Sequence, residues 1–257
     1  MNETLDIRLS RMDTDSPEPQ VFATIQGEGR HTGEPATFIR LSGCNLACSF
    51  CDVPETWRFE GTPASRAPHE SDEIFRKDQE EITAGIERIT DIVVGNLPRH
   101  LVITGGEPLI QQDKIINLAD EVRLRDPRFF IEIETNGTIA PRPDLIKVID
   151  WFNVSPKLEN SGNPLKKRIK PRAMEAFAAL PQADFKFVIS RDEDIQEVLG
   201  LVDLYGIPPS RVFLMPEGRT KEKIEAGQSR LVDFCVVYGF NLSTRLHIFL
   251  FGDKRGT

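Results

Sequence analysis

Gly43-Cys44-Asn45-Leu46-Ala47-Cys48-Ser49-Phe50-Cys51-Asp52 places three cysteines within eight residues, spaced C-x3-C-x2-C. Thiolates are soft ligands that favour zinc, copper(I) or iron–sulfur clusters. A structural zinc site needs four protein ligands, and no histidine lies at the usual spacing to complete one. Because an electron-transfer 4Fe–4S cluster takes four cysteines, a cluster held by three has one iron open to a small molecule. The stretch predicts such an open metal centre, with a Cys3His zinc site as the weaker alternative.

Length and composition predict a single α/β domain over residues 1–257. No apolar run is long enough to cross a bilayer, and the N-terminus lacks the basic start and apolar core of a secretion signal. Cysteines grouped as metal ligands indicate a reducing compartment, so we expect a cytoplasmic protein. The net charge of −8 argues against nucleic-acid binding, because phosphate neutralisation needs a basic face.

Strand and helix patterns alternate along the chain, which predicts parallel strands joined by helical crossovers. Strand 36–41 leads directly into the cysteine stretch. The expected elements after it are helix 74–93 with Ser71 as its cap, strand 100–104, helix 112–125, strand 129–134, helix 141–149, strand 150–154, helix 171–180, strand 184–189, helix 192–204, strand 211–215, helix 220–238 and strand 242–249. These form six or seven units, fewer than the eight of a closed TIM barrel. Residues 1–20 are polar and contain two prolines, which predicts a loosely ordered lead-in.

Polar motifs stand at the ends of the predicted strands, where barrel enzymes collect their active residues. Gly105-Gly106-Glu107, Glu134-Thr135-Asn136-Gly137 and Ser155-Pro156-Lys157 each follow a strand, and His247 lies in the last one. Upstream, Gln26-Gly27-Glu28-Gly29 predicts a tight loop in which the backbone approaches a ligand. Simpler interpretations exist for these motifs, namely surface turns and a packed core histidine.

The cysteine spacing, with Phe50 before the last cysteine, resembles the cluster loop of radical S-adenosylmethionine (SAM) enzymes, and Gly105-Gly106-Glu107 resembles their SAM motif. The resemblance implies a modified, partial (β/α)6-type TIM-like barrel with a 4Fe–4S cluster on Cys44, Cys48 and Cys51. SAM would bind the open iron and be cleaved to methionine and a 5′-deoxyadenosyl radical. Since that radical abstracts the hydrogen, no protein residue is expected to do so. The SAM-binding residues implied are Phe50, Asp52, Gly105, Gly106, Glu107, Ser155 and Lys157.

From Gln26 onward the chain resembles the 7-carboxy-7-deazaguanine synthases of this superfamily. The matching stretches are Gln26-Gly27-Glu28-Gly29, Phe38-Ile39-Arg40, Ser42-Gly43-Cys44, Cys51-Asp52, Thr56-Trp57, Ile103-Thr104-Gly105-Gly106-Glu107-Pro108, Glu134-Thr135-Asn136-Gly137, Ser155-Pro156-Lys157 and His247. The resemblance implies a carbon–nitrogen lyase that converts 6-carboxy-5,6,7,8-tetrahydropterin to 7-carboxy-7-deazaguanine with loss of ammonia, in queuosine or deazapurine biosynthesis. It also implies a homodimer served by an electron donor such as flavodoxin or ferredoxin.

The same resemblance assigns the substrate to Gln26, Gly27, Glu28, Arg40 and His247. Glu28 can accept two hydrogen bonds from an amino-pyrimidine edge, and Arg40 offers a bidentate fork to a carboxylate. Arg40 could instead form a structural ion pair.

One position departs from the family's pattern. The family carries a Thr or Ser after Cys51-Asp52 to ligate magnesium, whereas this chain has Val53, which has no side-chain oxygen for an oxygen-seeking cation. We therefore expect either that Asp52, backbone and substrate hold the ion, or that the enzyme depends on magnesium less than its family does.

Two other functions are compatible with these motifs. One is a different radical SAM reaction, such as the activation of a glycyl-radical enzyme, for which the pterin-type residues would be coincidental. The other is a zinc-stabilised binding module without catalysis, which iron and sulfide analysis would distinguish from both enzymes.

Overall fold

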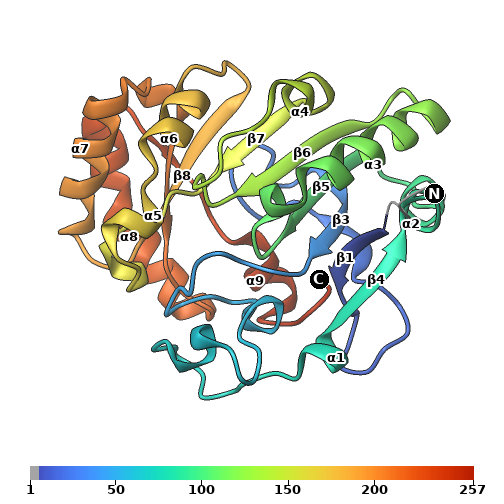
Figure 1. Ribbon diagram of the computed structural model, residues 1–257. Coiled ribbons are helices and arrows are strands. Elements are labelled where there is room, and N and C mark those ends of the chain that lie inside the picture. Colours follow the sequence, from blue (N-terminus) through green and yellow to red (C-terminus); the bar gives the residue numbers. More distant parts are fainter. Residues whose placement is uncertain (1–5) are drawn as a thin grey trace.

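The computed structural model describes residues 6–257, which contain one ten-stranded sheet (Figure 1). Its parallel strands are β3 (Pro35–Leu41), β5 (His100–Gly105), β6 (Phe130–Thr135), β7 (Trp151–Val154), β8 (Ala183–Ile189), β9 (Val212–Pro216) and the short β10 (Asn241–Leu242). Beyond β3 the antiparallel strands β1 (Asp6–Ser10) and β4 (Glu81–Gly85) extend the sheet, and β2 (Val21–Ile25) also pairs with β3. The main path of these strands ends at β10 and β4, which do not pair with each other, so the barrel is open.

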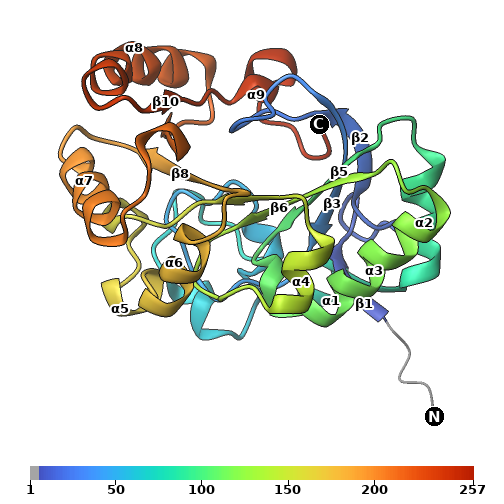
Figure 2. The ribbon, with the colours of Figure 1, turned by 90° about the horizontal axis from the view of Figure 1, so that it is seen from above.

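Six helices connect successive parallel strands. They are α2 (Ile86–Gly95), α3 (Gln112–Arg125), α4 (Pro143–Val148), α6 (Pro171–Ala178), α7 (Asp194–Tyr205) and α8 (Lys221–Tyr238). The remaining α-helices of residues 6–257 are short: α1 (Lys77–Glu80), α5 (Leu165–Arg168) and α9 (Leu246–Phe251). Figure 2 shows α3, α4 and α6 on one face of the sheet, and α9 with the C-terminus on the other. No helix in the described part of the chain combines the length and the apolar character needed to cross a membrane.

The two faces of the strands differ in chemistry because side chains alternate along a strand. In β6, Ile131 and Ile133 are fully buried in the core beneath the helices. Glu132 and Glu134 point the other way, into the barrel, where they accept hydrogen bonds from Gln26 and other polar groups. The barrel interior is therefore polar, and the apolar core lies between the sheet and its helices.

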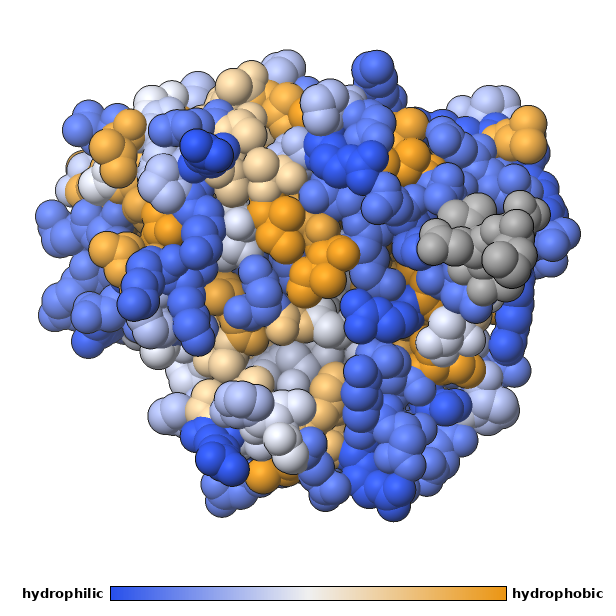
Figure 3. Space-filling view, in the orientation of Figure 1, coloured by the Kyte–Doolittle hydropathy of each residue, from blue (hydrophilic) through white to orange (hydrophobic). Residues whose placement is uncertain are grey.

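The face of the molecule seen in Figure 3 is mostly hydrophilic, with apolar residues in small patches. Below the centre of that face the surface is hollowed and lined by residues of intermediate hydropathy.

The alternating α/β pattern predicted between residues 100 and 238 is confirmed element by element. Three expectations are wrong. The lead-in predicted over residues 1–20 contains β1, in which Ile7 and Leu9 are fully buried; residues 1–5 lie outside the described range. The helix predicted over 74–93 is divided into α1, β4 and α2, because β4 pairs with β1 along its whole length. Such a partner, distant in sequence, leaves no local signal.

The last expected strand, 242–249, is also wrong. Only Asn241 and Leu242 pair with β9, and His247 lies on α9. Short apolar runs do not distinguish strand from helix by periodicity alone, and here contacts with the loop around Gly27 accompany the helical form.

Candidate active site

A cavity of about 510 Å³ lies at the carboxyl ends of the parallel strands. Almost all of the residues predicted from sequence line it: Gln26, Gly27, Glu28, Arg40, Cys44, Cys48, Phe50, Cys51, Asp52, Val53, Gly105, Gly106, Ser155, Lys157 and His247. Segments that are more than 200 residues apart in the chain thus meet around one space. Glu107 is the exception and does not line the cavity.

The three cysteines are free thiols on the wall of this cavity. Burial raises the pKa of all three, that of Cys44 to about 12. Each sulfur faces a side-chain N–H donor, of which Trp57 Nε1 lies 3.2 Å from Cys51 Sγ and Asn163 Nδ2 lies 3.3 Å from Cys48 Sγ. Asn136 Nδ2 is more distant, 4.0 Å from Cys44 Sγ.

This donor set fits a cluster with three thiolate ligands. In proteins, the sulfurs that ligate iron–sulfur clusters accept hydrogen bonds from nearby N–H groups. Because the thiols are protonated near neutral pH, metal binding would release their protons.

The glycine pair lets two loops pack backbone against backbone. A Cβ atom on Gly105, whose φ is +133°, would lie less than 3.0 Å from the Leu41 carbonyl, and one on Gly106 equally close to the Gly43 carbonyl. The amides of Gly106 and Glu107 donate hydrogen bonds to those carbonyls, at 3.0 and 2.8 Å. The glycines are therefore required by the cysteine loop itself, whatever ligand the cavity binds.

Glu107 is fully engaged within the protein. Its carboxylate accepts hydrogen bonds from Leu109 N (2.9 Å), Thr135 Oγ1 (2.7 Å) and Asn136 N (2.7 Å). Burial raises its pKa, although these hydrogen bonds oppose the shift. Glu107 thereby fixes the loop after β6, which carries the donor Asn136.

The loop after β2 is covered by the C-terminal segment. Leu246 N donates to Gly27 O at 2.9 Å, and Gly29 N donates to Ser243 Oγ at 2.9 Å. The His247 ring sits so close that a Cβ atom on Gly27 would lie less than 3.0 Å from its Nδ1. The glycines of Gln26-Gly27-Glu28-Gly29 thus let α9 place His247 at the cavity.

Four charged side chains form a network inside the cavity. Glu28 accepts hydrogen bonds from Lys186 Nζ and, at 3.0 Å, from Arg245 Nε, and Arg245 also pairs with Asp52. Burial alone would raise the pKa of Glu28, but the charges of Lys186 and Arg245 hold it well below its usual range. The pKa of Asp52 is lowered by the same balance, with Arg245 as the main opposing charge.

Several polar groups at the cavity are buried without a hydrogen-bond partner among residues 6–257. They include both amide atoms of Gln20 and of Asn153, and Nε of Arg40. No carboxylate in this range forms an ion pair with Arg40, so the structural ion pair considered from sequence is absent there. Buried polar groups normally have partners, so unpaired ones at a cavity indicate a polar ligand.

Sequence reasoning missed Gln20, Asn153, Lys186 and Arg245. Asn153 and Lys186 alternate with apolar residues in Trp151-Phe152-Asn153-Val154 and Asp184-Phe185-Lys186-Phe187, and a period-two reading of these strands could have found them. Arg245 has no such local signal, because only the position of the chain after β10 brings it to Glu28.

This fold and cavity define a class of enzyme that cleaves SAM at an iron–sulfur cluster. Residues 38–204 match the family model of the Radical SAM superfamily, so the chain belongs to that superfamily, and a 4Fe–4S cluster and SAM follow from membership.

Individual relatives define the family more narrowly. A 7-carboxy-7-deazaguanine synthase from Pyrobaculum aerophilum is 38% identical over 238 residues, which cover 92% of this chain and 95% of the relative. One from Escherichia coli K12 is 33% identical over 244 residues, 91% and 97% of the two chains. The crystal structure of QueE from Escherichia coli matches with a TM-score of 0.63 and 26% identity, over 93% of this chain and 95% of that one. The chain belongs to the 7-carboxy-7-deazaguanine synthase family.

Proposed function

We propose that this chain converts 6-carboxy-5,6,7,8-tetrahydropterin to 7-carboxy-7-deazaguanine with loss of ammonia. The observation that carries the proposal is the meeting of the three cysteines with unpaired buried polar groups around one cavity. The family relationship supports the reaction, and the cavity's chemistry suits a small, polar, carboxylated heterocycle.

Each polar group has a role that matches part of this substrate. The Arg40 guanidinium, free of a protein carboxylate in the described residues, binds the substrate carboxylate through its planar fork. The Asn153 amide offers one donor and one acceptor to the ring edge. Glu28, kept ionised by Lys186 and Arg245, accepts from the amino-pyrimidine group with its remaining lone pairs.

Cys44, Cys48 and Cys51 would hold the cluster, which together with SAM would supply the radical chemistry. Phe50, Asp52, Gly105, Gly106, Ser155 and Lys157 form the SAM side of the cavity. Lys157 Nζ donates to Ser155 Oγ at 2.9 Å, which fixes both side chains. Glu107 contributes as a positioning residue through Asn136 rather than by contact with SAM.

We further propose a weaker magnesium requirement than the family's. Val53 lines the cavity without a ligating oxygen. Asp52, the other side chain that could hold the ion, is paired with Arg245. The guanidinium thus supplies positive charge to this carboxylate and competes with a metal ion for it.

Two remaining proposals rest on the family alone: a homodimer, and reduction by a flavodoxin or ferredoxin. The proposed cytoplasmic location rests on the grouping of the cysteines as metal ligands. Activation of a glycyl-radical enzyme is less compatible with the buried charge network, which would need to accept a peptide backbone.

One assay tests the reaction. Anaerobically reconstituted protein is reduced with dithionite, supplied with SAM and the carboxytetrahydropterin, and followed by absorbance and mass spectrometry. We expect the deazapurine product with SAM consumed substoichiometrically, and none from Cys44→Ala. SAM cleavage without deazapurine would reject this substrate and favour another radical SAM reaction.

A further inference from the structure

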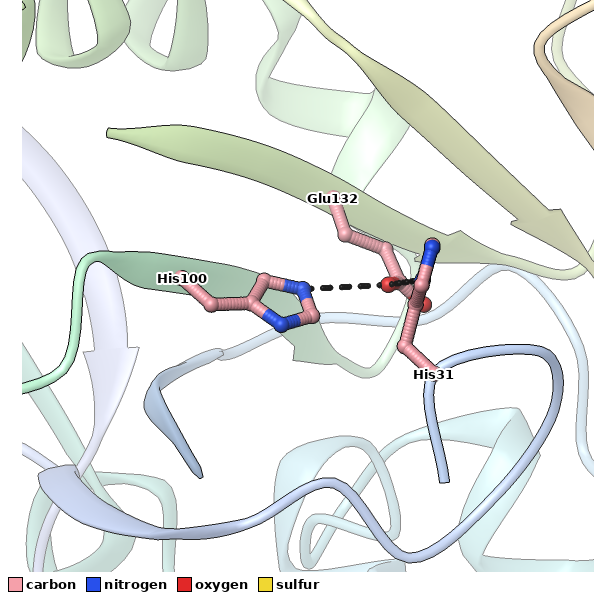
Figure 4. Close-up of side chains that lie close together, drawn as sticks. All are labelled: His31, His100 and Glu132. Atoms are coloured by element: carbon pink, nitrogen blue, oxygen red, sulfur yellow. Dashed lines mark hydrogen bonds and ion pairs between the residues drawn. The ribbon is translucent and has the colours of Figure 1, made fainter. Parts of the chain in front are cut away.

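A second group of metal-ligating side chains lies at the opposite end of the barrel from the cysteines. His100 is the first residue of β5, Glu132 lies on β6, and His31 belongs to the loop between β2 and β3 (Figure 4). None of the three lines the active-site cavity. The proposed reaction gives them no role.

The three side chains converge on one point. His31 Nδ1 lies 2.7 Å and His100 Nε2 lies 3.1 Å from the same oxygen, Glu132 Oε2. All the ligating atoms lie within 4.8 Å of one another. In a tetrahedral zinc site with bonds near 2.0–2.1 Å, ligand atoms are about 3.3 Å apart, so small outward shifts of these side chains would admit an ion.

The second nitrogen of His100 supports a metal more than a simple hydrogen-bonded triad. His100 Nδ1 is buried without a hydrogen-bond partner and faces Glu34 Oε2 at 3.5 Å. If a neutral His100 donates from Nε2 to Glu132, its unprotonated Nδ1 faces the Glu34 carboxylate, and two hydrogen-bond acceptors then face each other. If Nε2 binds a metal, Nδ1 carries the proton and donates to Glu34, the carboxylate–histidine–metal arrangement common in proteins.

The surroundings suit a bound divalent ion, with water in the coordination position that three protein ligands leave open. His100 and Glu132 are buried, and the rings of Phe130 and Trp151 lie 5.1 and 5.6 Å from that of His31. Two carboxylates, Glu132 and Glu34, would balance a divalent charge. The nearby cation Arg30 is already paired with Asp184, at 2.6 Å.

We propose that His31, His100 and Glu132 bind one zinc ion that anchors the loop after β2 to the base of the barrel. Gln26 Nε2 lies 3.4 Å from Glu132 Oε1, so the ion sits directly beneath the loop that carries Glu28 into the cavity. The Glu34 side chain is half exposed, so this carboxylate lies between the proposed ion site and solvent.

Zinc titration of the cluster-loaded full-length protein tests the proposal, because the cluster occupies the cysteines. After chelator treatment and dialysis, we expect calorimetry to give one zinc per chain. X-ray absorption at the zinc edge should show nitrogen and oxygen neighbours near about 2.0–2.1 Å and no sulfur near about 2.3 Å. Sulfur neighbours, or no binding, would overturn the site and leave a hydrogen-bonded triad.

Two variants locate the ion. His100→Gln should weaken zinc binding at least about 100-fold, and Glu34→Gln about tenfold through the lost outer contact. Glu34 is exposed enough for its variant to fold even if His100→Gln does not. Glu159→Gln, on an exposed side chain elsewhere, should bind as the unmodified protein does. Unchanged affinity in Glu34→Gln, with a folded protein, would contradict the proposal. Neither the zinc titration nor the X-ray absorption measurement depends on turnover. Failure of the zinc proposal would therefore leave the proposed reaction untouched.

Discussion

Arg245, near the C-terminus, joins two carboxylates from the N-terminal part of the chain, Glu28 from the loop after β2 and Asp52 from the cysteine loop. Its side chain is almost fully buried, and breaking a buried ion pair leaves an uncompensated charge. The charge network thus couples the proposed substrate side of the cavity to the cluster side.

We expect Glu28→Gln to destabilise the protein by about 3 kcal/mol at pH 7, because it leaves Lys186 without its closest partner. The pKa of Glu28 is lower in the folded state than in the unfolded state, where it is about 4.3. The contribution of ionised Glu28 to the free energy of unfolding is therefore fully present above pH values of about 4.3 and is lost as the pH falls from there towards the folded-state pKa. Chemical denaturation at several pH values measures this. The exposed Glu87→Gln serves as control. A stability difference that persists unchanged at pH 3 would contradict the pairing.

Val53→Thr tests the magnesium proposal at the same scale. The unmodified enzyme should lose less than about threefold in turnover after chelation, and the threonine variant should respond more strongly because it gains an oxygen ligand. Val53→Ala removes both γ-methyl groups without adding oxygen, and its response should match that of the unmodified enzyme. A steep loss of turnover on removing magnesium from the unmodified enzyme, restored at micromolar levels, would reject the proposal.

At the scale of elements, α9 packs against Gly27, where there is no room for a side chain. Gly27→Ala should displace α9, because the new Cβ would collide with His247, and we expect substrate affinity to fall by about tenfold or more. Iron content should not change, since the cysteines lie elsewhere on the cavity wall. Gly200→Ala in α7 meets no atom within 4 Å and should be neutral or slightly stabilising. Binding measured by calorimetry with the pterin separates the two, and equal affinities would show that α9 tolerates the added carbon.

Strand β1 belongs to the core rather than to a mobile terminus. Leu9→Ala should cost about 2–5 kcal/mol in unfolding free energy, since Leu9 is fully buried between β3 and β4. Leu97→Ala, at a position that is 93% exposed, should change it by less than about 0.5 kcal/mol. Urea unfolding compares them. A loss below about 1 kcal/mol for Leu9→Ala would mean that β1 is dispensable.

For the whole molecule, the apolar core lies between the sheet and its helices, whereas the cluster site lies at the carboxyl ends of the strands. Removal of the iron should therefore leave the fold intact. We expect the Cys44→Ala, Cys48→Ala, Cys51→Ala triple variant to keep its far-ultraviolet circular dichroism and one cooperative unfolding transition, with iron near zero instead of about four per chain. Loss of the transition would mean that the cluster is needed for folding.

Sequence by itself determined the cluster loop, the parallel α/β pattern and many of the residues that line the cavity. These are local signals: cysteine spacing, glycines at tight turns and apolar strands that end in polar residues. Cys44, Gly106 and Ser155 each sit where a strand ends, and the carboxyl ends of parallel strands meet at one edge of the sheet.

Only the tertiary structure decided the pairings between distant segments. Each of these contacts depends on where a distant part of the chain returns. They are the pairing of β1 with β4, the contact of Gly27 with His247, and the ion pairs of Arg245 with Glu28 and Asp52. The same holds for Glu107, whose carboxylate is taken up by the loop after β6, and for the histidine pair at Glu132. Such contacts arise because folding brings together segments that are separated by long loops around a shared core. Which segments meet depends on the packing of the whole chain, and the residues at the two ends of a loop do not determine it.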